Sequence, residues 1–538
     1  MDPAYATCTR AAVAGALLAA MLLSTGAAAQ EHVHAPGATE RLGTVHFATS
    51  CAPEGAPDFN RAVALLHSFE FGASIRAFNG VIARDSTCAM AWWGLALSHW
   101  NNPMAPGNRA PALLQRGREA AQAAARLGDG ATERERQYIA AVGQLYADYE
   151  NRDQWTRLVA YEQAMSHVVA QQPHDSEAKI FHALALAASA PPTDKSYANQ
   201  LRAGAILESI LSAQPEHPGI AHYIIHSYDV PALAGRASAA ARRYAEIAPS
   251  AAHALHMPSH TFTRVGMWEE SVNTNLRSME VATRGGSWSE VLHAADYAVY
   301  AYLQMRRDSA ARAILTELPA IAAKFDPNAV TGAAPGSAGV FALAAMPARY
   351  ALERHAWSEA AELQPTATMF SYAEALTYFA RGLAAAHLRN VALARASIDS
   401  LSAITARLSA ANESYWAGQV AIQQLGTQAW LDLAGGRTAD ALTNMRVAAD
   451  REDATEKSAV TPGPLAPARE LLGDMLLQLN HPAEALAEYR LALAREPNRY
   501  RSLDGAMKAA AAAGDQESAA GYAAQLTRLT GGQAGGPP

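Results

Sequence analysis

The sequence is poor in cysteine, in aromatic residues and in charged residues. Three cysteines in 538 residues exclude a disulfide-dense scaffold, and aromatic residues make up only 7%. Because strands favour aromatic and β-branched residues, this shortage and the abundance of alanine favour close-packed helices. Charged residues make up 17%, and 43 basic against 50 acidic side chains give a net charge of −7. We therefore expect no nucleic-acid partner.

Several motifs of well-defined chemistry are also missing. The chain contains no H-E-x-x-H, no C-x-x-C-H, no phosphate-binding loop and no G-x-S-x-G elbow. Their absence argues against a zincin protease, a c-type cytochrome, a P-loop nucleotide-binding protein and an α/β-hydrolase. The length exceeds that of a usual domain several-fold, so a single compact core is not expected.

The first 29 residues have the pattern of a secretory signal peptide. Arg10 precedes an apolar stretch, residues 11–23, and the small residues Ala27–Ala29 follow it. This stretch is too short to span a membrane, so we expect cleavage after Ala29 and export to a bacterial periplasm or the extracellular space. No later segment has about 18 uninterrupted apolar residues, so we expect no membrane span after the signal is removed.

Two cysteines remain after removal of the signal, because Cys8 lies within it. In an oxidising compartment, a pair such as Cys51 and Cys88 more often forms a disulfide than a catalytic thiol. The sequence therefore predicts a Cys51–Cys88 disulfide.

Internal repeats organise the rest of the chain. The clearest unit covers 466–499, and its spacing depends on Leu472-Gly473, Ala485, Tyr489, Ala492 and Pro497. A second match is Trp92-x2-Leu95-Ala96-x2-His99. These units resemble the 34-residue tetratricopeptide (TPR) consensus, in which a small residue lets two antiparallel helices approach and a proline ends the pair. The resemblance covers most of 58–530 and implies an all-α superhelix of helical hairpins, an α-solenoid with a concave surface.

Several shorter elements are similar to a group of exported bacterial TPR proteins with no assigned activity. They are Phe47-x2-Ser50-Cys51, Leu66-His67-Ser68-Phe69, Cys88-Ala89-Met90-Ala91, the stretch from His253 to His260, and Thr461-Pro462-Gly463. This resemblance implies the same fold and export, and no particular reaction.

Two regions interrupt the repeats and suggest the domain organisation. Residues 101–130 begin with a polar, proline-containing run, and 324–339 are rich in Gly, Ala and Pro. We predict a signal peptide (1–29), an N-terminal arm (30–57), an N-terminal TPR array (58–323), a linker or loop (324–339), a C-terminal TPR array (340–530) and a disordered tail (531–538).

The histidines are clustered in one part of the chain. Seven of the 18 lie between His217 and His293, about one seventh of the sequence. His222 and His226 are spaced i, i+4, and His253, His256 and His260 are spaced i, i+3, i+7, so each set can share one face of a helix. Pro258 interrupts the second set and can begin a new helix there.

The repeat positions of these residues predict a common surface. Counted from the prolines that end each unit, they occupy first-helix positions that line the concave groove in the TPR family. The predicted groove residues are His222, His226, Asp229, His253, His256, His260, Arg264, His293, Asp296 and Tyr300.

Three hypotheses account for this cluster. The first is a binding protein or scaffold that recognises a protein or peptide partner through the His-rich groove. The second is a site for one transition metal, Zn, Cu or Fe, bound by His222, His226, His256 and His260, with Asp229 or Asp296 as ligand or orienting group. The third is a metal-dependent enzyme in which Arg264 stabilises an anion.

Other side chains are expected to be structural. His67 and His182 lie in apolar stretches typical of buried, hydrogen-bonded histidines. Trp93 and Trp100 fit the hydrophobic face of a repeat, although their repeat positions also allow ligand stacking.

Overall fold

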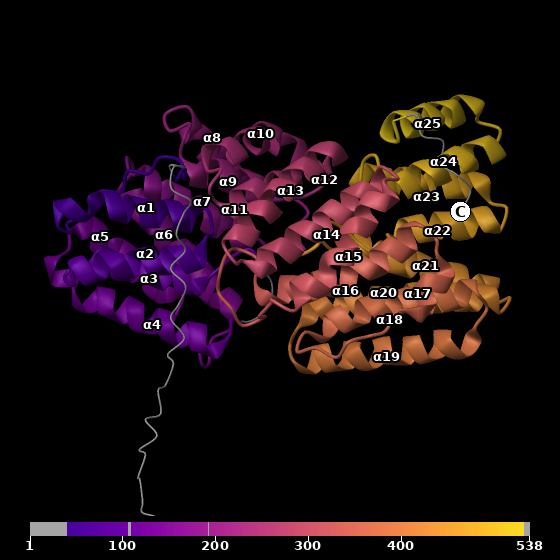
Figure 1. Ribbon diagram of the computed structural model, residues 1–538, viewed down its shortest axis with the longest axis horizontal. Coiled ribbons are helices and arrows are strands. Elements are labelled where there is room, and N and C mark those ends of the chain that lie inside the picture. Colours follow the sequence, from indigo (N-terminus) through magenta and orange to yellow (C-terminus); the bar gives the residue numbers. More distant parts are fainter. Residues whose placement is uncertain (1–39, 106–108, 192, 532–538) are drawn as a thin grey trace, which may run out of the picture. The chain divides into compact units, whose positions relative to one another are not determined.

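The computed structural model describes residues 40–105, 109–191 and 193–531. Every regular element in these ranges is a helix, as Figure 1 shows. The predicted signal peptide and most of the predicted tail lie outside the described residues. Within the described ranges, no helix combines the length and the apolar character needed to cross a membrane.

The helices up to residue 322 follow one another with short connections. They are α1 (Ala56–His67), α2 (Phe71–Arg84), α3 (Ala89–Trp100), α4 (Pro111–Arg126), α5 (Glu133–Gln144), α6 (Gln154–Gln171), α7 (Ser176–Ala188), α8 (Ala198–Leu211), α9 (Pro218–Ser227), α10 (Ser238–Ile247), α11 (Ala252–His256), α12 (Pro258–Arg264), α13 (Trp268–Arg284), α14 (Trp288–Gln304) and α15 (Asp308–Ala322). Short 3₁₀ turns lie at Pro53–Gly55, Gly128–Gly130 and Ala234–Ala237.

The remaining helices continue the same pattern to the end of the described chain. They are α16 (Gly336–Glu353), α17 (Trp357–Glu362), α18 (Ser371–His387), α19 (Val391–Ala410), α20 (Ser414–Ala434), α21 (Thr438–Asp453), α22 (Ala468–Gln478), α23 (Pro482–Arg495), α24 (Tyr500–Ala512) and α25 (Gln516–Leu529).

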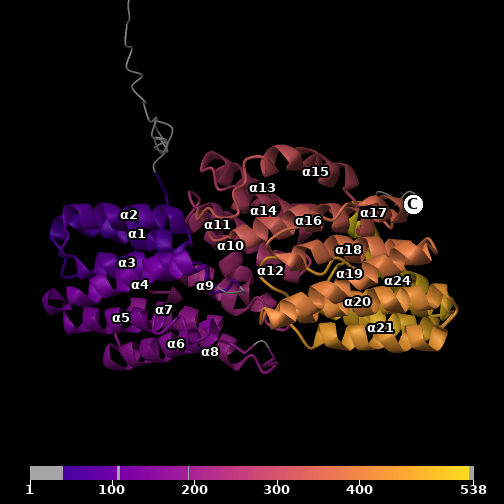
Figure 2. The same cartoon turned by 90° about the horizontal axis from the view of Figure 1, so that it is seen from below.

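Consecutive helices pack as hairpins, and Figure 2 shows this for the series α18 to α21. The unit predicted over 466–499 is the pair α22 and α23. Gly473 faces the Tyr489 ring so closely that a Cβ on Gly473 would lie 2.8 Å from it. Asn480, at the turn between these helices, has a φ of 63°, which asparagine tolerates better than most residues. The predicted all-α fold of TPR-type hairpins is confirmed.

The hydrophobic core has two main parts. One contains buried residues between Leu42 and Phe262 together with Ala333, and the other contains residues from Ala334 to Ala519. Residues of α14, α15 and α16 form a smaller apolar cluster. The segment predicted as a linker is ordered within this arrangement, because Ala333 and Ala334 are buried and α16 begins at Gly336.

Cys51 and Cys88 are joined as a disulfide, with their Cα atoms 4.8 Å apart. The bond connects the segment that precedes α1 to the residue before α3. This is the pair that the sequence predicts.

Candidate metal centre

Six histidines from four helices lie together in the interior. His222 and His226 come from α9, His253 and His256 from α11, His260 from α12, and His293 from α14. Prolines start α9 and α12, which suits the first helical position, where no backbone N–H is needed. The break at Met257 separates α11 from α12, so the three histidines between 253 and 260 do not form one continuous face.

The first group, which we call triad A, consists of His222, His226 and His253. One ligand nitrogen from each ring lies within 4.8 Å of the others, and all three side chains are buried. His222 Nδ1 lies 2.6 Å from the carbonyl oxygen of His67, so Nδ1 carries the proton and Nε2 carries the lone pair. Among the described residues, His222 Nε2, His226 Nε2 and both nitrogens of His253 have no hydrogen-bond partner.

The second group, triad B, consists of His256, His260 and His293, again buried and with ligand nitrogens within 4.8 Å of one another. His256 Nδ1 lies 2.7 Å from Asn275 Oδ1, and His260 Nδ1 lies 2.8 Å from Asp229 Oδ2. The two Nε2 atoms of His256 and His260 face each other at 3.1 Å.

The triads are neighbours. The ring centroids of His226 and His260 are 6.2 Å apart, and those of His253 and His256 are 5.9 Å apart. A cavity of about 20 Å³ is lined by His226 and His253 from triad A and by His260 and His293 from triad B. This volume is sufficient for a water molecule or a small ion.

Carboxylates lie next to both triads. Asp229 accepts a hydrogen bond from Arg264 Nε at 2.9 Å, and its Oδ2 is 3.6 Å from Lys457 Nζ. Burial opposes ionisation of Asp229, but Lys457, Arg264 and His260 outweigh it and hold the pKa of this carboxyl well below its usual value. Glu290 Oε1 accepts from the Ala334 N–H at 2.6 Å, and Oε2 lies 3.9 Å from His253 Nδ1.

Four of these histidines, His222, His256, His260 and His293, are held in their neutral form. Burial, with the neighbouring imidazoles adding to it, lowers the pKa of His222 and His256 well below the ordinary value. Burial likewise lowers the pKa of His260 to about 4 and that of His293 to about 3, although Asp229 and Glu290 act in the opposite direction. A neutral imidazole is the form that binds metals.

Three segments that interrupt the helical repeats cover the cavity. Asn102 and Ala105 belong to the first, Ala333–Pro335 to the second, and Ala459 and Val460 to the third. The Asn102 side-chain amide donates to the Ala333 carbonyl at 3.1 Å. The Tyr297 hydroxyl donates towards the carbonyls of Ala459 and Thr461, at 3.3 and 3.1 Å.

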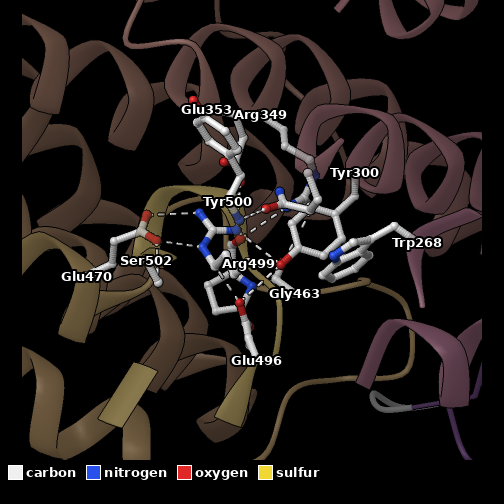
Figure 3. A network of polar contacts seen from close by, with 12 residues as sticks. Trp268, Tyr300, Arg349, Glu353, Gly463, Glu470, Glu496, Arg499, Tyr500 and Ser502 are labelled. Atoms are coloured by element: carbon white, nitrogen blue, oxygen red, sulfur yellow. Dashed lines mark hydrogen bonds and ion pairs between the residues drawn. The ribbon is translucent and has the colours of Figure 1, made fainter. Parts of the chain in front are cut away.

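Two of the predicted groove residues on α14, Asp296 and Tyr300, have partners other than the histidines, and Figure 3 shows the network around Tyr300. Asp296 pairs with Arg349 Nε at 3.2 Å, and both side chains are fully buried. The Tyr300 hydroxyl accepts from Arg499 Nη1 and donates to Glu496 Oε2, each at 3.0 Å. These contacts hold α14 against the C-terminal repeats, so Asp296 and Tyr300 are not part of the six-histidine cluster.

The same network fixes the third covering segment. Arg349 donates to the carbonyl oxygens of Gly463 and Pro464, at 3.2 and 3.1 Å. Arg499 pairs with Glu470 through Nε at 2.8 Å and Nη2 at 3.0 Å. The buried Arg349 therefore fixes Gly463 and Pro464, and Ala459 and Val460 of the same segment line the histidine cavity.

No family model matches this chain, and no curated protein matches it. Among solved structures, it is similar to human IFIT1 with PPP-AAAA, with 12% identity, a TM-score of 0.40, and 89% and 95% of the two chains covered. It is also similar to the APC/C hetero-tetramer Cut9–Hcn1, with 12% identity, a TM-score of 0.31, and 88% and 93% covered. Likeness at this level says nothing about what the chain binds.

The other residues singled out in the sequence are buried. Trp93 packs against Phe47 and Tyr138, and Trp100 is 3% exposed. His182 lies 2.9 Å from Glu162, and His67 lies 3.0 Å from Glu177. Glu177 also contacts His217 at 3.0 Å, which makes a second buried polar group.

Sequence reasoning did not identify three residues of the site. Asn275 orients His256, Glu290 lies beside His253, and Lys457 lies beside Asp229. Of these three, only Glu290 could have been found from sequence spacing, because it precedes His293 by three residues, nearly one helical turn. Asn275 and Lys457 reach the site through tertiary contacts.

Proposed function

We propose that this protein binds a transition metal at the six-histidine centre formed by triads A and B. The observation that carries the proposal is the contact between His256 Nε2 and His260 Nε2 at 3.1 Å. Both Nδ1 atoms point at oxygen acceptors and so carry the protons. Two nitrogen lone pairs therefore face each other in a buried site. A cation bound by both nitrogens would remove the repulsion between them.

The orientation of Asn275 supports this proton assignment. Its amide NH₂ donates to the Ser271 carbonyl at 2.7 Å, so its oxygen faces His256. His260 is oriented by the Asp229 carboxylate, and His222 by a backbone carbonyl. Acceptors of this kind on Nδ1 fix the orientation of metal-binding histidines and leave Nε2 as the ligand.

Burial favours a metal over a peptide as the ligand of these residues. The six histidine side chains are at most 6% exposed, and the cavity beside them has about 20 Å³. A peptide or a partner protein cannot touch them in this state. Imidazole-only donor sets suit zinc, copper and iron, and we propose that the ion is one of these. The rest of the protein serves as a helical repeat scaffold that holds the centre.

We also propose that the protein works outside the cytoplasm. The proposal is supported by the Cys51–Cys88 disulfide, because such bonds persist in oxidising compartments. N-terminal sequencing of protein recovered from the culture medium or the periplasm tests it. A protein retained in the cytoplasm with an intact residue 1 would refute export.

Elemental analysis by mass spectrometry tests the metal proposal on protein purified without a His tag. We expect at least one equivalent of zinc, copper or iron, and one equivalent less in His256→Gln and in His260→Gln. His182→Gln is a matched control, because it removes a buried, hydrogen-bonded histidine outside the centre. Asn275→Leu should weaken binding about 10- to 100-fold through loss of the orienting acceptor.

Two results would contradict the proposal. The first is no bound metal after incubation with each of the three ions and desalting. The second is equal metal loss in His182→Gln and His256→Gln, because general destabilisation would then explain the effect. Either result would return the histidine cluster to a structural role and leave recognition of a protein partner as the function to test.

A further inference from the structure

The two triads open onto the same cavity, and this sharing has a chemical consequence. Of the residues that line it, His226 and His253 belong to triad A, and His260 and His293 belong to triad B. We propose that the centre is dinuclear, with one ion in each triad, and that a small anion in the shared cavity bridges the two ions. This inference rests on the proposed function, because it needs the metal centre to exist.

The number of ions follows from the reach of a metal–nitrogen bond. Zinc binds imidazole at about 2.0–2.1 Å, so two nitrogens of one ion lie at most about 4.2 Å apart. Each triad, with its three nitrogens within 4.8 Å of one another, needs only a small contraction to hold an ion. Each triad also has its own orienting acceptors, the His67 carbonyl for triad A and Asn275 and Asp229 for triad B.

The closeness of the triads makes a bridge possible. Rings from the two triads approach to centroid distances of 5.9 and 6.2 Å. A ligand placed between His226 and His260 lies beside both triads, since both rings line the cavity. Its other walls include the apolar side chains of Met257, Ala338 and Val460. The polar side chain of Asn102 also lines it, but its amide is already hydrogen-bonded to the Ala333 carbonyl and to the Met104 N–H.

The charges around the centre favour an anion in this position. Two divalent ions bring four positive charges, and the neighbouring carboxylate of Glu290, 3.9 Å from the His253 ring, supplies one negative charge. Glu70 Oε1 accepts from the His253 backbone N–H at 3.2 Å, but burial and Glu290 raise the pKa of Glu70 to about 8, so this group adds little negative charge. Asp229 adds no net negative charge, because Arg264 and Lys457 lie against it. The remaining positive charge attracts a small anion such as hydroxide, for which azide is a convenient probe.

Loading the full-length protein with Cu(II) tests this inference. We expect two copper ions per chain by elemental analysis, one azide bound per pair, and an azide-to-copper charge-transfer band. Bridging couples the two Cu(II) ions, so the electron paramagnetic resonance signal should fall well below that of two isolated ions. His222→Gln and His293→Gln should each keep one copper ion with a full signal, while His182→Gln should behave as the unmodified protein.

A second variant separates the cavity from the metal ligands. Ala338 is fully buried on α16 and lines the cavity, so Ala338→Leu fills the space for the anion and leaves all six histidines in place. It should keep both copper ions and bind azide at least ten-fold more weakly.

The outcomes distinguish this inference from the proposed function. One copper ion per chain overturns the dinuclear centre and leaves the metal site standing. Two copper ions with full, independent signals in the presence of azide overturn the bridge. No copper at all overturns both proposals.

Discussion

Replacing Arg349 with methionine removes a fully buried guanidinium that pairs with Asp296 at 3.2 Å. The Asp296 carboxylate would remain in the interior without its partner, and the carbonyls of Gly463 and Pro464 would each lose a donor. Removal of one member of a buried ion pair costs about 3–5 kcal/mol. We expect Arg349→Met to lower the free energy of unfolding by this amount.

A double-mutant cycle identifies the cause of that loss. Asp296→Asn should cost about 1–3 kcal/mol, because it keeps the volume and one hydrogen-bonding oxygen. Arg349→Met combined with Asp296→Leu should be about 1–3 kcal/mol less destabilised than the sum of Arg349→Met and Asp296→Leu measured singly, because no unpaired charge remains.

Urea unfolding followed by circular dichroism measures these differences, and the metal content measures their effect on the site. Arg349 also holds residues 461–464, which directly follow the cavity-lining Ala459 and Val460, so Arg349→Met should speed the loss of bound metal to a chelator. A loss of less than 1 kcal/mol for Arg349→Met, or strict additivity in the cycle, would refute the reasoning.

Three further changes have expected results that follow from single contacts. Cys51→Ala removes a disulfide that closes a loop with a sequence separation of 37, and it should lower the free energy of unfolding in urea by about 4 kcal/mol. A reductant should lower the stability only of the protein that retains Cys51 and Cys88. Gly473→Ala places a methyl group 2.8 Å from the Tyr489 ring and should cost about 1–3 kcal/mol, and an unchanged melting temperature would show that the hairpin adjusts freely. Burial and Arg501 lower the pKa of His387 to about 4, whereas the unfolded value is about 6.5. Between these pH values the unfolded chain binds a proton that the folded chain does not, so stability should fall by at most about 2 kcal/mol from pH 7 to pH 5, and His387→Leu should lack this share of the pH dependence.

The sequence predicted the fold because local features of each repeat determine it. A glycine that faces an aromatic ring, as Gly473 faces Tyr489, and a proline at a helix boundary act within a few tens of residues. Such features repeat along the chain and can be recognised without knowledge of the whole structure.

The membership of the site was only partly predictable, because it depends on which way each helix faces. The spacing of the histidines indicated that they gather, and six of them do lie together. Helical spacing alone could not show that Asp296 and Tyr300 point from α14 towards Arg349 and Arg499. It also could not show that His253 and His256, both on α11, belong to different triads, whereas His256 and His260 belong to the same triad although Pro258 starts a new helix between them.

The positions of the covering segments in the sequence determine when each is made relative to the histidines, because synthesis starts at the N-terminus. Synthesis as far as His293 supplies all six histidines, while two of the three covering segments, at Ala333–Pro335 and Ala459–Val460, are still to be made. The growing chain therefore passes through a stage in which the histidines are present and two of their covering segments are not. In the finished protein all three segments cover the cavity, so both the entry and the release of an ion require some of these contacts to open.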